Sequence, residues 1–370
     1  MLEGIRVIEI GQVLAAPYAA CILGDLGADI IKIEKPQGGD DGRRMGPAYR
    51  GQDSMQFVEI NRNKRSVVLD FKTPEGSEQL HRLLSDADIL VHNLRPGIAE
   101  ECGLDAATLC ERYPRLVYCE VSGFGDRGPL SPLGGFEPVA QAFSGLISVN
   151  GHPDTPPARV GASVIDYGTA MWIVIGAISA LYRRTQTGRG GVVTGSLLET
   201  ALTFVGPHIS AYLNQGREPK RLGTGNPMLV PYQAFAASDG DILIAAGNDR
   251  LFEKLSRTLG HPEWPNDARF ATNRARVLNR DALIALIGVE IAANKKSHWF
   301  AALCEAGVPC APVNTVAEAV ADPHVKALEL LQALPGTTAL VAGLPLRFDG
   351  ERPAFRLPAP ELGADNDLLS

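Results

Sequence analysis

The sequence predicts an α/β fold built around a doubly wound, largely parallel sheet. Short buried strands alternate with helices over residues 5–121, which is the pattern of successive β-α-β units. The chain has 370 residues, enough for two domains with a sizeable core. The alternation stops after residue 121 and the pattern changes again near residue 217, so we expect a second, smaller domain.

The elements of the large domain follow one another in a regular order. Five apolar segments predict strands, at residues 5–10, 29–34, 64–70, 88–92 and 116–121. Helices are predicted at residues 17–26, 74–85, 106–112 and 137–149. Pro74 suits the first turn of its helix, where a backbone N–H has no intrahelical partner. Residues 192–198 fit a strand and a helix equally well.

Asp166 stands at the start of the most apolar helix that the sequence predicts. Residues 170–181 are apolar nearly all round this helix, so we expect it to be buried on every side. The carboxylate has two interpretations: an N-cap that accepts backbone N–H groups, or an ionised nucleophile that faces a cleft. Caps are far commoner than catalytic acids, so this segment alone favours the cap.

The later part of the chain predicts a smaller domain. Residues 223–227 form a glycine-rich loop. Residues 232–237 and 241–246 flank a Ser-Asp-Gly turn, which is typical of a β-hairpin. Several helices follow to about residue 334, and we expect the small domain to span residues 225–328.

Charge and composition restrict the possible partners. The net charge of −7 argues against a nucleic-acid-binding protein, although a local basic pocket for a small anion remains possible. No signal pattern and no apolar run of membrane-spanning length is found, so a cytoplasmic protein without membrane contact is expected. The six cysteines form no CxxC pair and no histidines lie at zinc spacing, so we predict reduced thiols and no metal site.

Most catalytic motifs are absent. The sequence has no phosphate loop of the GxxxxGK type, no GxSxG elbow and no HExxH motif. Residues 123–128 spell GFGDRG, but Pro129 and Pro132 follow at once, so no helix can begin there to hold a pyrophosphate. We interpret this GxGxxG match as a turn.

Basic residues follow several predicted strands. Lys35, Lys72 and Arg95 each lie just after a strand, where ligands gather in doubly wound sheets. Each cation taken alone is best explained as ordinary solvated charge. Their recurrence at one edge of the sheet indicates an anionic, nucleotide-like ligand.

Five segments resemble the class III (family III) CoA-transferases. This group includes the formyl-CoA:oxalate and carnitine CoA-transferases and α-methylacyl-CoA racemase. The matching segments are VIEIGQVLAAPYAACILGDLGADIIKIEKPQGGD, NRNKRSVVLDFKTPEG, DILVHNLRPG, LVYCEVSGFGDRGPL and RVGASVIDYGTAMWIVIGAISALYRRTQTGRGG. They occur in the family's order and cover nearly the whole chain, with a weaker match after residue 328.

The resemblance implies an interlocked homodimer. Each chain would have a large Rossmann-like, CoA-binding domain made from both chain ends and a small α+β domain. The implied division is residues 1–200 for the large domain, 201–224 for a linker, 225–328 for the small domain and 329–370 for a return to the large domain. CoA thioesters would be substrates, with no tightly bound cofactor.

The resemblance also assigns roles to residues. Asp166 matches the family's catalytic aspartate, which reverses the preference for a cap. The glycine loop with Gly223 and Gly225 would cover the active site. Phe136 stands where racemases carry a catalytic histidine, next to Glu137, and Glu101 stands where relatives often carry arginine. Positions matching CoA contacts are Leu14, Ala15, Lys35, Leu69, Asp70, Phe71, Lys72, Asn93, Leu94 and Arg95.

We therefore predict an acyl-CoA:carboxylate CoA-transferase. The carboxylate of Asp166 would attack a thioester to give an aspartyl-acyl anhydride and then an aspartyl-CoA thioester. Two alternatives stay open: an α-methylacyl-CoA epimerase and a non-catalytic CoA-binding protein. The sequence does not indicate the donor acid, the acceptor acid or the effect of Glu101.

Overall fold

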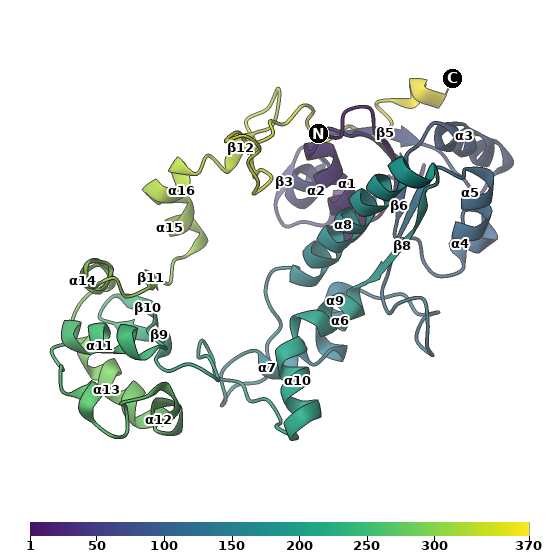
Figure 1. Ribbon diagram of the computed structural model, residues 1–370. Coiled ribbons are helices and arrows are strands. Elements are labelled where there is room, and N and C mark those ends of the chain that lie inside the picture. Colours follow the sequence, from purple (N-terminus) through teal and green to yellow (C-terminus); the bar gives the residue numbers. More distant parts are fainter. Residues whose placement is uncertain (370) are drawn as a thin grey trace. The chain divides into compact units, whose positions relative to one another are not determined.

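A six-stranded parallel sheet organises the computed structural model, which describes residues 1–369 (Figure 1). The predicted α/β fold with a parallel central sheet is confirmed. The chain runs outward from β1 to β5 and then crosses to β6 on the other side of β1, so the strand order reverses between β1 and β6. The strands in spatial order are β5 (Lys64–Val68), β2 (Asp29–Glu34), β1 (Arg6–Ile10), β6 (Ile89–His92), β7 (Val117–Ser122) and β8 (Gly191–Ser196).

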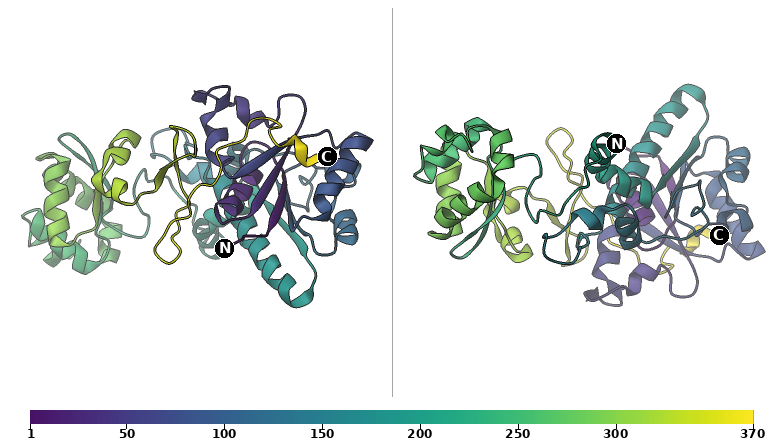
Figure 2. Two further views of the ribbon diagram at one scale, coloured as in Figure 1. Left: turned by 90° about the horizontal axis from the view of Figure 1, so that it is seen from above. Right: turned by 90° about the horizontal axis from the view of Figure 1, so that it is seen from below.

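Helices cover both faces of this sheet, because alternate residues of its strands point to opposite sides. Val7 packs with one group of helices and its neighbour Ile8 packs with the other. The first group contains α1 (Ala15–Asp25), α6 (Glu137–Phe143), α8 (Val164–Thr187) and α9 (Leu197–Phe204), and the second contains α3 (Pro74–Ser85), α4 (Ile98–Glu101) and α5 (Ala106–Arg112). Figure 2 shows the sheet between these layers.

Local signals set several helix ends. Thr73 caps α3 by accepting a hydrogen bond from the N–H of Gly76 at 3.1 Å, and Pro74 occupies the first turn as predicted. The helix predicted at residues 137–149 is interrupted at Gly145, which has φ +85°, so that α7 (Leu146–Val149) is separate from α6. Residues 192–198, which fitted a strand and a helix equally well, contain most of β8 and the first residues of α9, which follows directly.

The long helix α8 departs from the expectation of burial on every side. Ile173 and Ala177 are buried, but Trp172 is 48% exposed and Ile175 is 54% exposed. This helix of 24 residues is long and apolar enough to match a membrane span, a test that buried core helices also pass, and half of its apolar window is buried inside the chain. An apolar stripe of α8, formed by Met171, Trp172, Ile175 and Ile178, is thus left uncovered in the single chain.

Contacts group the chain into two compact units. Met1–Leu146, Arg159–Glu218 and the chain from Lys326 onward form the larger unit, while Ile147–Ala158 and Pro219–Val325 form the smaller one. Residues 147–158 thus cluster with the smaller unit, and the division predicted at residues 200, 224 and 328 stays a prediction.

The smaller unit contains an antiparallel sheet with its own core. Its strands, in spatial order, are β11 (Cys310–Pro312), β10 (Gly240–Ala245) and β9 (Tyr232–Ala237), and the predicted hairpin is the β9–β10 pair. The core of this unit includes Phe252, Phe270 and Trp299. Its helices are α11 (Asp249–Thr258), α12 (Asn273–Leu278), α13 (Arg280–Ala292), α14 (Lys296–Ala306) and α15 (Val316–Ala321).

The C-terminal segment packs along the outer strand of the parallel sheet. The N–H of Ser66 in β5 donates to Asp365 at 2.9 Å, and the N–H of Val68 donates to Asn366 at 2.8 Å. The edge of β5 is therefore covered by side chains from the far end of the chain. The remaining elements are β3 (Tyr49–Arg50), β4 (Asp53–Ser54), α2 (Met55–Ile60), α10 (Gly206–Gln215), α16 (Pro323–Ala327), β12 (Leu331–Ala333) and β13 (Leu340–Ala342), with short 3₁₀ turns at Asp41–Arg44, Trp264–Asn266 and Asn366–Leu369.

Candidate active site

The carboxyl ends of the parallel strands lie at one edge of the sheet and bring the predicted CoA contacts to that edge. Lys35 follows β2, residues 69–72 follow β5 and residues 93–95 follow β6. Leu14 and Ala15 follow β1 and begin α1. Residues far apart in the sequence therefore share one edge, as the ligand-binding prediction requires.

Asn93 joins the two strands between which the order reverses. Its Oδ1 accepts from the N–H of Gln12 at 2.8 Å, and its Nδ2 donates to the carbonyl of Gln12 at 2.9 Å. Gln12 follows β1 and Asn93 follows β6, so this reciprocal pair spans the reversal point, where doubly wound folds bind ligands. Leu14, two residues further on, caps α1 without a side-chain hydrogen bond.

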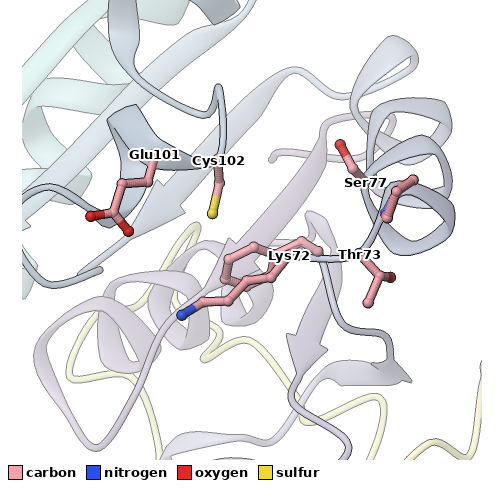
Figure 3. Close-up of a pocket in the computed structure, with 7 residues that line it drawn as sticks. Lys72, Thr73, Ser77, Glu101 and Cys102 are labelled. Carbon is pink, nitrogen blue, oxygen red and sulfur yellow. The ribbon is translucent and has the colours of Figure 1, made fainter.

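A pocket of about 360 Å³ lies beyond β5 (Figure 3). Lys72 comes from the loop after β5, and Glu101 comes from the end of α4. Glu101 thus lines the same pocket as Lys72, which is a predicted CoA contact. The lining residues are Phe71, Lys72, Thr73, Pro74, Ser77, Glu101 and Cys102.

The two other predicted cations differ in their surroundings. The Nζ of Lys35 lies 2.7 Å from Asp41 Oδ1, and both side chains are exposed. Arg95 is exposed and forms no ion pair within residues 1–369. The charge of Lys35 is already balanced by a carboxylate, whereas the charge of Arg95 is available for an anion.

This difference predicts unequal effects on CoA binding. Arg95→Ala is expected to weaken CoA binding more than Lys35→Ala, and the loss should shrink at high salt because exposed charge contacts are screened. Isothermal titration calorimetry at low and high salt measures both. Arg82→Ala, at an arginine of α3 that follows no strand end, is the control. Equal affinities for Arg95→Ala and wild type at low salt would assign Arg95 to ordinary surface charge.

Asp166 lies in the first turn of α8 but does not cap it. The N-cap residue is Ser163, so the capping interpretation of Asp166 is wrong. The carboxylate is half-buried and has no hydrogen-bond partner among residues 1–369. Burial raises the pKa of Asp166 to about 7, with a smaller contribution from the negative charge of Glu137.

Glu137 is the carboxylate whose negative charge acts on Asp166, although 29 positions separate them in the sequence. It begins α6, is 4% exposed and accepts a hydrogen bond from Gln141. Gln141 in turn accepts from the N–H of Val160 at 2.9 Å, so it ties Glu137 to the segment that leads into α8. Phe136, the N-cap of α6, is 69% exposed.

Both glycines of the loop in the smaller unit are closely packed. Gly223 has φ +60°, and a Cβ added there would lie 2.6 Å from the ring of His152. A Cβ at Gly225 would lie 3.0 Å from the carbonyl oxygen of Leu222. Arg221 fixes the backbone around His152 by donating to three carbonyls between His152 and Thr155. Sequence reasoning found the two glycines but not the packing of His152 and Arg221 around them, because these contacts join segments that are distant in the sequence.

Comparisons with known proteins agree on one family. The model of CoA-transferase family III matches residues 2–366. The succinate–glutarate CoA-transferase of Agrobacterium fabrum is 35% identical, over 98% of this chain and 93% of that protein. The acetyl-CoA:oxalate CoA-transferase of Acetobacter aceti is 36% identical, over 99% and 94%. The crystal structure of a CAIB/BAIF family protein from Brucella suis superimposes with a TM-score of 0.87 at 37% identity, covering 99% of this chain and 97% of that one.

The chain belongs to CoA-transferase family III. It is an enzyme, an acyl-CoA:carboxylate CoA-transferase that uses CoA thioesters as substrates. The predictions of family and activity are confirmed. The roles of individual residues remain proposals.

Proposed function

We propose that this CoA-transferase works by covalent catalysis on Asp166. A carboxylate oxygen of Asp166 attacks the thioester carbonyl. The C–S bond breaks, which gives an aspartyl-acyl anhydride and releases CoA as a thiolate. The thiolate then attacks the aspartyl carbonyl of the anhydride, which releases the donor acid and leaves an aspartyl-CoA thioester. The acceptor carboxylate reverses both steps. One thioester replaces another, so the exchange needs no other energy source.

The free carboxylate of Asp166 carries this proposal. A capping aspartate would engage backbone N–H groups with its oxygens, but no such hydrogen bond of Asp166 forms among residues 1–369. Its lone pairs remain available for attack, and the start of α8 favours negative charge at this position. Partial burial limits the water that would compete with the acceptor acid. The expected loss of transfer in Asp166 variants, argued in the Discussion, is the direct test.

The CoA site is proposed at the strand-end edge. The reversal of strand order between β1 and β6 supports a Rossmann-like description of the large unit. Leu14, Ala15 and Asn93 lie at this reversal, while Lys35, residues 69–72 and Arg95 extend the site along the edge. The CoA thioester is a substrate in this proposal, with no tightly bound cofactor.

Short dicarboxylic acids are the proposed substrates. The relatives named above exchange CoA with succinate, glutarate and oxalate, and human and mouse relatives are succinyl-CoA:glutarate CoA-transferases. Mass spectrometry of reactions pairing succinyl-CoA and acetyl-CoA with acids of two to six carbons identifies the preferred pair. Preference for monocarboxylic acids would contradict this assignment.

A homodimer is proposed because the apolar stripe of α8 is uncovered in the single chain. Exposed apolar side chains in a continuous row mark a surface that another chain covers. The interlocked arrangement implied by the resemblance predicts that dimers persist on dilution, because the chains cannot separate without unfolding. Mass photometry at nanomolar protein concentration measures this. A folded monomer at that concentration would contradict interlocking.

Epimerisation is not expected. It requires one group that removes the α-proton and another that delivers a proton on the opposite face. Phe136 cannot exchange protons, and the Glu137 side chain next to it in the sequence is only 4% exposed. A 2-methylacyl-CoA incubated in heavy water should therefore keep its α-hydrogen over many transfer turnovers. Rapid deuteration with loss of stereochemistry would support the epimerase alternative instead.

A further inference from the structure

The turn between β1 and α1 has an unusual backbone conformation. Val13 has a φ of 66°, a left-handed value that is rare for a β-branched residue. Before it, Gly11 has no space for a side chain, since an added Cβ would lie 2.8 Å from Glu9 Oε1 and 2.9 Å from Pro17 Cδ. A strained turn of this kind persists only where the surrounding structure holds it.

Asp40, in the loop after β2, holds the strained residue directly. Its Oδ1 accepts from the N–H of Val13 at 2.9 Å and from the N–H of Gly42 at 2.8 Å. Its Oδ2 lies 2.8 Å from Lys32 Nζ, and both side chains are fully buried. Burial alone would raise the pKa of Asp40, but Lys32 and the two N–H donors keep it below the usual value. Asp40 is therefore an ionised clamp on the backbone of Val13.

Lys32 holds the turn on the other side of Gln12. Its Nζ donates to the carbonyl of Gly11 at 3.1 Å and is paired with Glu9 at 2.6 Å. Asn93 forms hydrogen bonds with both the N–H and the carbonyl of Gln12, which lies between Gly11 and Val13. Three side chains from separate loops and strands thus fix consecutive backbone groups of the turn.

This turn positions the start of α1 relative to Asp166. It leads directly to Leu14 and Ala15, whose backbone N–H groups have no acceptor within residues 1–369. The helix α1 packs against α8, with the ring of Tyr18 4.7 Å from that of Tyr167, the neighbour of Asp166. A shift of the turn would therefore move these N–H groups with respect to the reacting carboxylate.

We propose that Asp40 is a positioning residue for the CoA thioester. By fixing Val13 it presents the free N–H groups of Leu14 and Ala15 to CoA in a geometry that needs no rearrangement on binding. This inference rests on the proposed CoA site and adds a residue that does not itself touch the substrate.

The isosteric variant Asp40→Asn tests the clamp. Whichever way the amide turns, its NH₂ group faces a donor, either Lys32 or the N–H of Val13, so the turn loosens. We expect the KM for acyl-CoA and the Kd for CoA to rise about tenfold, with a smaller change in kcat and none in the KM of the acceptor acid.

Asp25→Asn is the matched control. Asp25 is also buried in the same unit and is bonded on both oxygens, to Arg62 and Asn63, but it lies at the opposite end of α1. This control should lower thermal stability without changing the KM for acyl-CoA. A wild-type KM in Asp40→Asn, or an equal rise in the control, would overturn the proposal.

Substitutions of Val13 provide a second test that leaves the buried charges in place. Val13→Pro forces a negative φ and removes the N–H, whereas Val13→Gly accepts the positive φ and keeps the N–H. We expect Val13→Pro to raise the Kd for CoA about tenfold and Val13→Gly to leave it within about twofold. Indistinguishable affinities in the two variants would overturn the role of the turn.

The outcomes separate this inference from the proposed function. If Asp166 variants lose transfer while Asp40→Asn and Val13→Pro bind CoA normally, only the positioning role fails. If Asp166→Asn retains transfer, the proposed mechanism fails whatever the Asp40 variants show.

Discussion

Replacing Asp166 with alanine or asparagine is expected to reduce CoA transfer by about four powers of ten or more, as when other covalent nucleophiles are removed. Because its carboxylate makes no hydrogen bond within residues 1–369, both variants should fold and bind CoA with nearly unchanged affinity. Steady-state transfer assays and calorimetry with CoA measure the two quantities separately.

Two controls make this test specific. Asp86→Asn changes an exposed aspartate at the end of α3, on the opposite face of the sheet, and should leave transfer unchanged. The mass of the Asp166→Asn protein must exclude deamidation, which would regenerate the nucleophile. Transfer near the wild-type rate in undeamidated Asp166→Asn would show that another group forms the covalent intermediate.

The activity should also depend steeply on pH. Burial and the charge of Glu137 raise the pKa of Asp166 to about 7, and only the ionised carboxylate attacks. The value of kcat/KM should therefore rise about tenfold per pH unit below pH 7 and level off above it, since kcat/KM reports the free enzyme. A profile from pH 5 to pH 8.5 measures this. A flat profile across that range would mean that Asp166 has an ordinary pKa in the free enzyme.

Glu137→Gln should move that profile to lower pH. The amide keeps an oxygen for the hydrogen bond from Gln141 but removes the negative charge that disfavours ionisation of Asp166. Glu111→Gln, on α5 at the opposite face of the sheet, is the matched control and should leave the midpoint in place. An unshifted midpoint in Glu137→Gln would mean that burial alone raises the pKa of Asp166.

Local patterns predicted much of the larger unit. The helix at residues 74–85 was placed correctly because Thr73 and Pro74 mark its start within the sequence itself. The interruption at Gly145 was missed, since a single glycine in an apolar run does not show which backbone angle it adopts. For residues 192–198 the apolar run contains a strand and the start of a helix, so neither periodicity dominates.

Contacts between distant residues could not be predicted in this way. Asp166 was found from its position at a helix start, but the effect of Glu137 on its pKa depends on how α6 packs. The clamp on Val13 depends equally on Asp40 reaching back to a turn 27 positions earlier. The stripe of α8 containing Trp172 and Ile175 was expected to be buried, because apolar periodicity does not tell which chain will cover a surface.

The covering of β5 by the C-terminal segment has a consequence for synthesis on the ribosome. Asp365 and Asn366 lie 299 and 298 positions after the residues of β5 that they contact, so the edge of β5 stays unpaired while this long intervening stretch is translated. Most of the smaller unit, by contrast, lies in one continuous stretch, 219–325, which can fold as it emerges. In a nascent chain stalled before Asp365, the smaller unit should therefore be folded and the larger unit should be sensitive to protease.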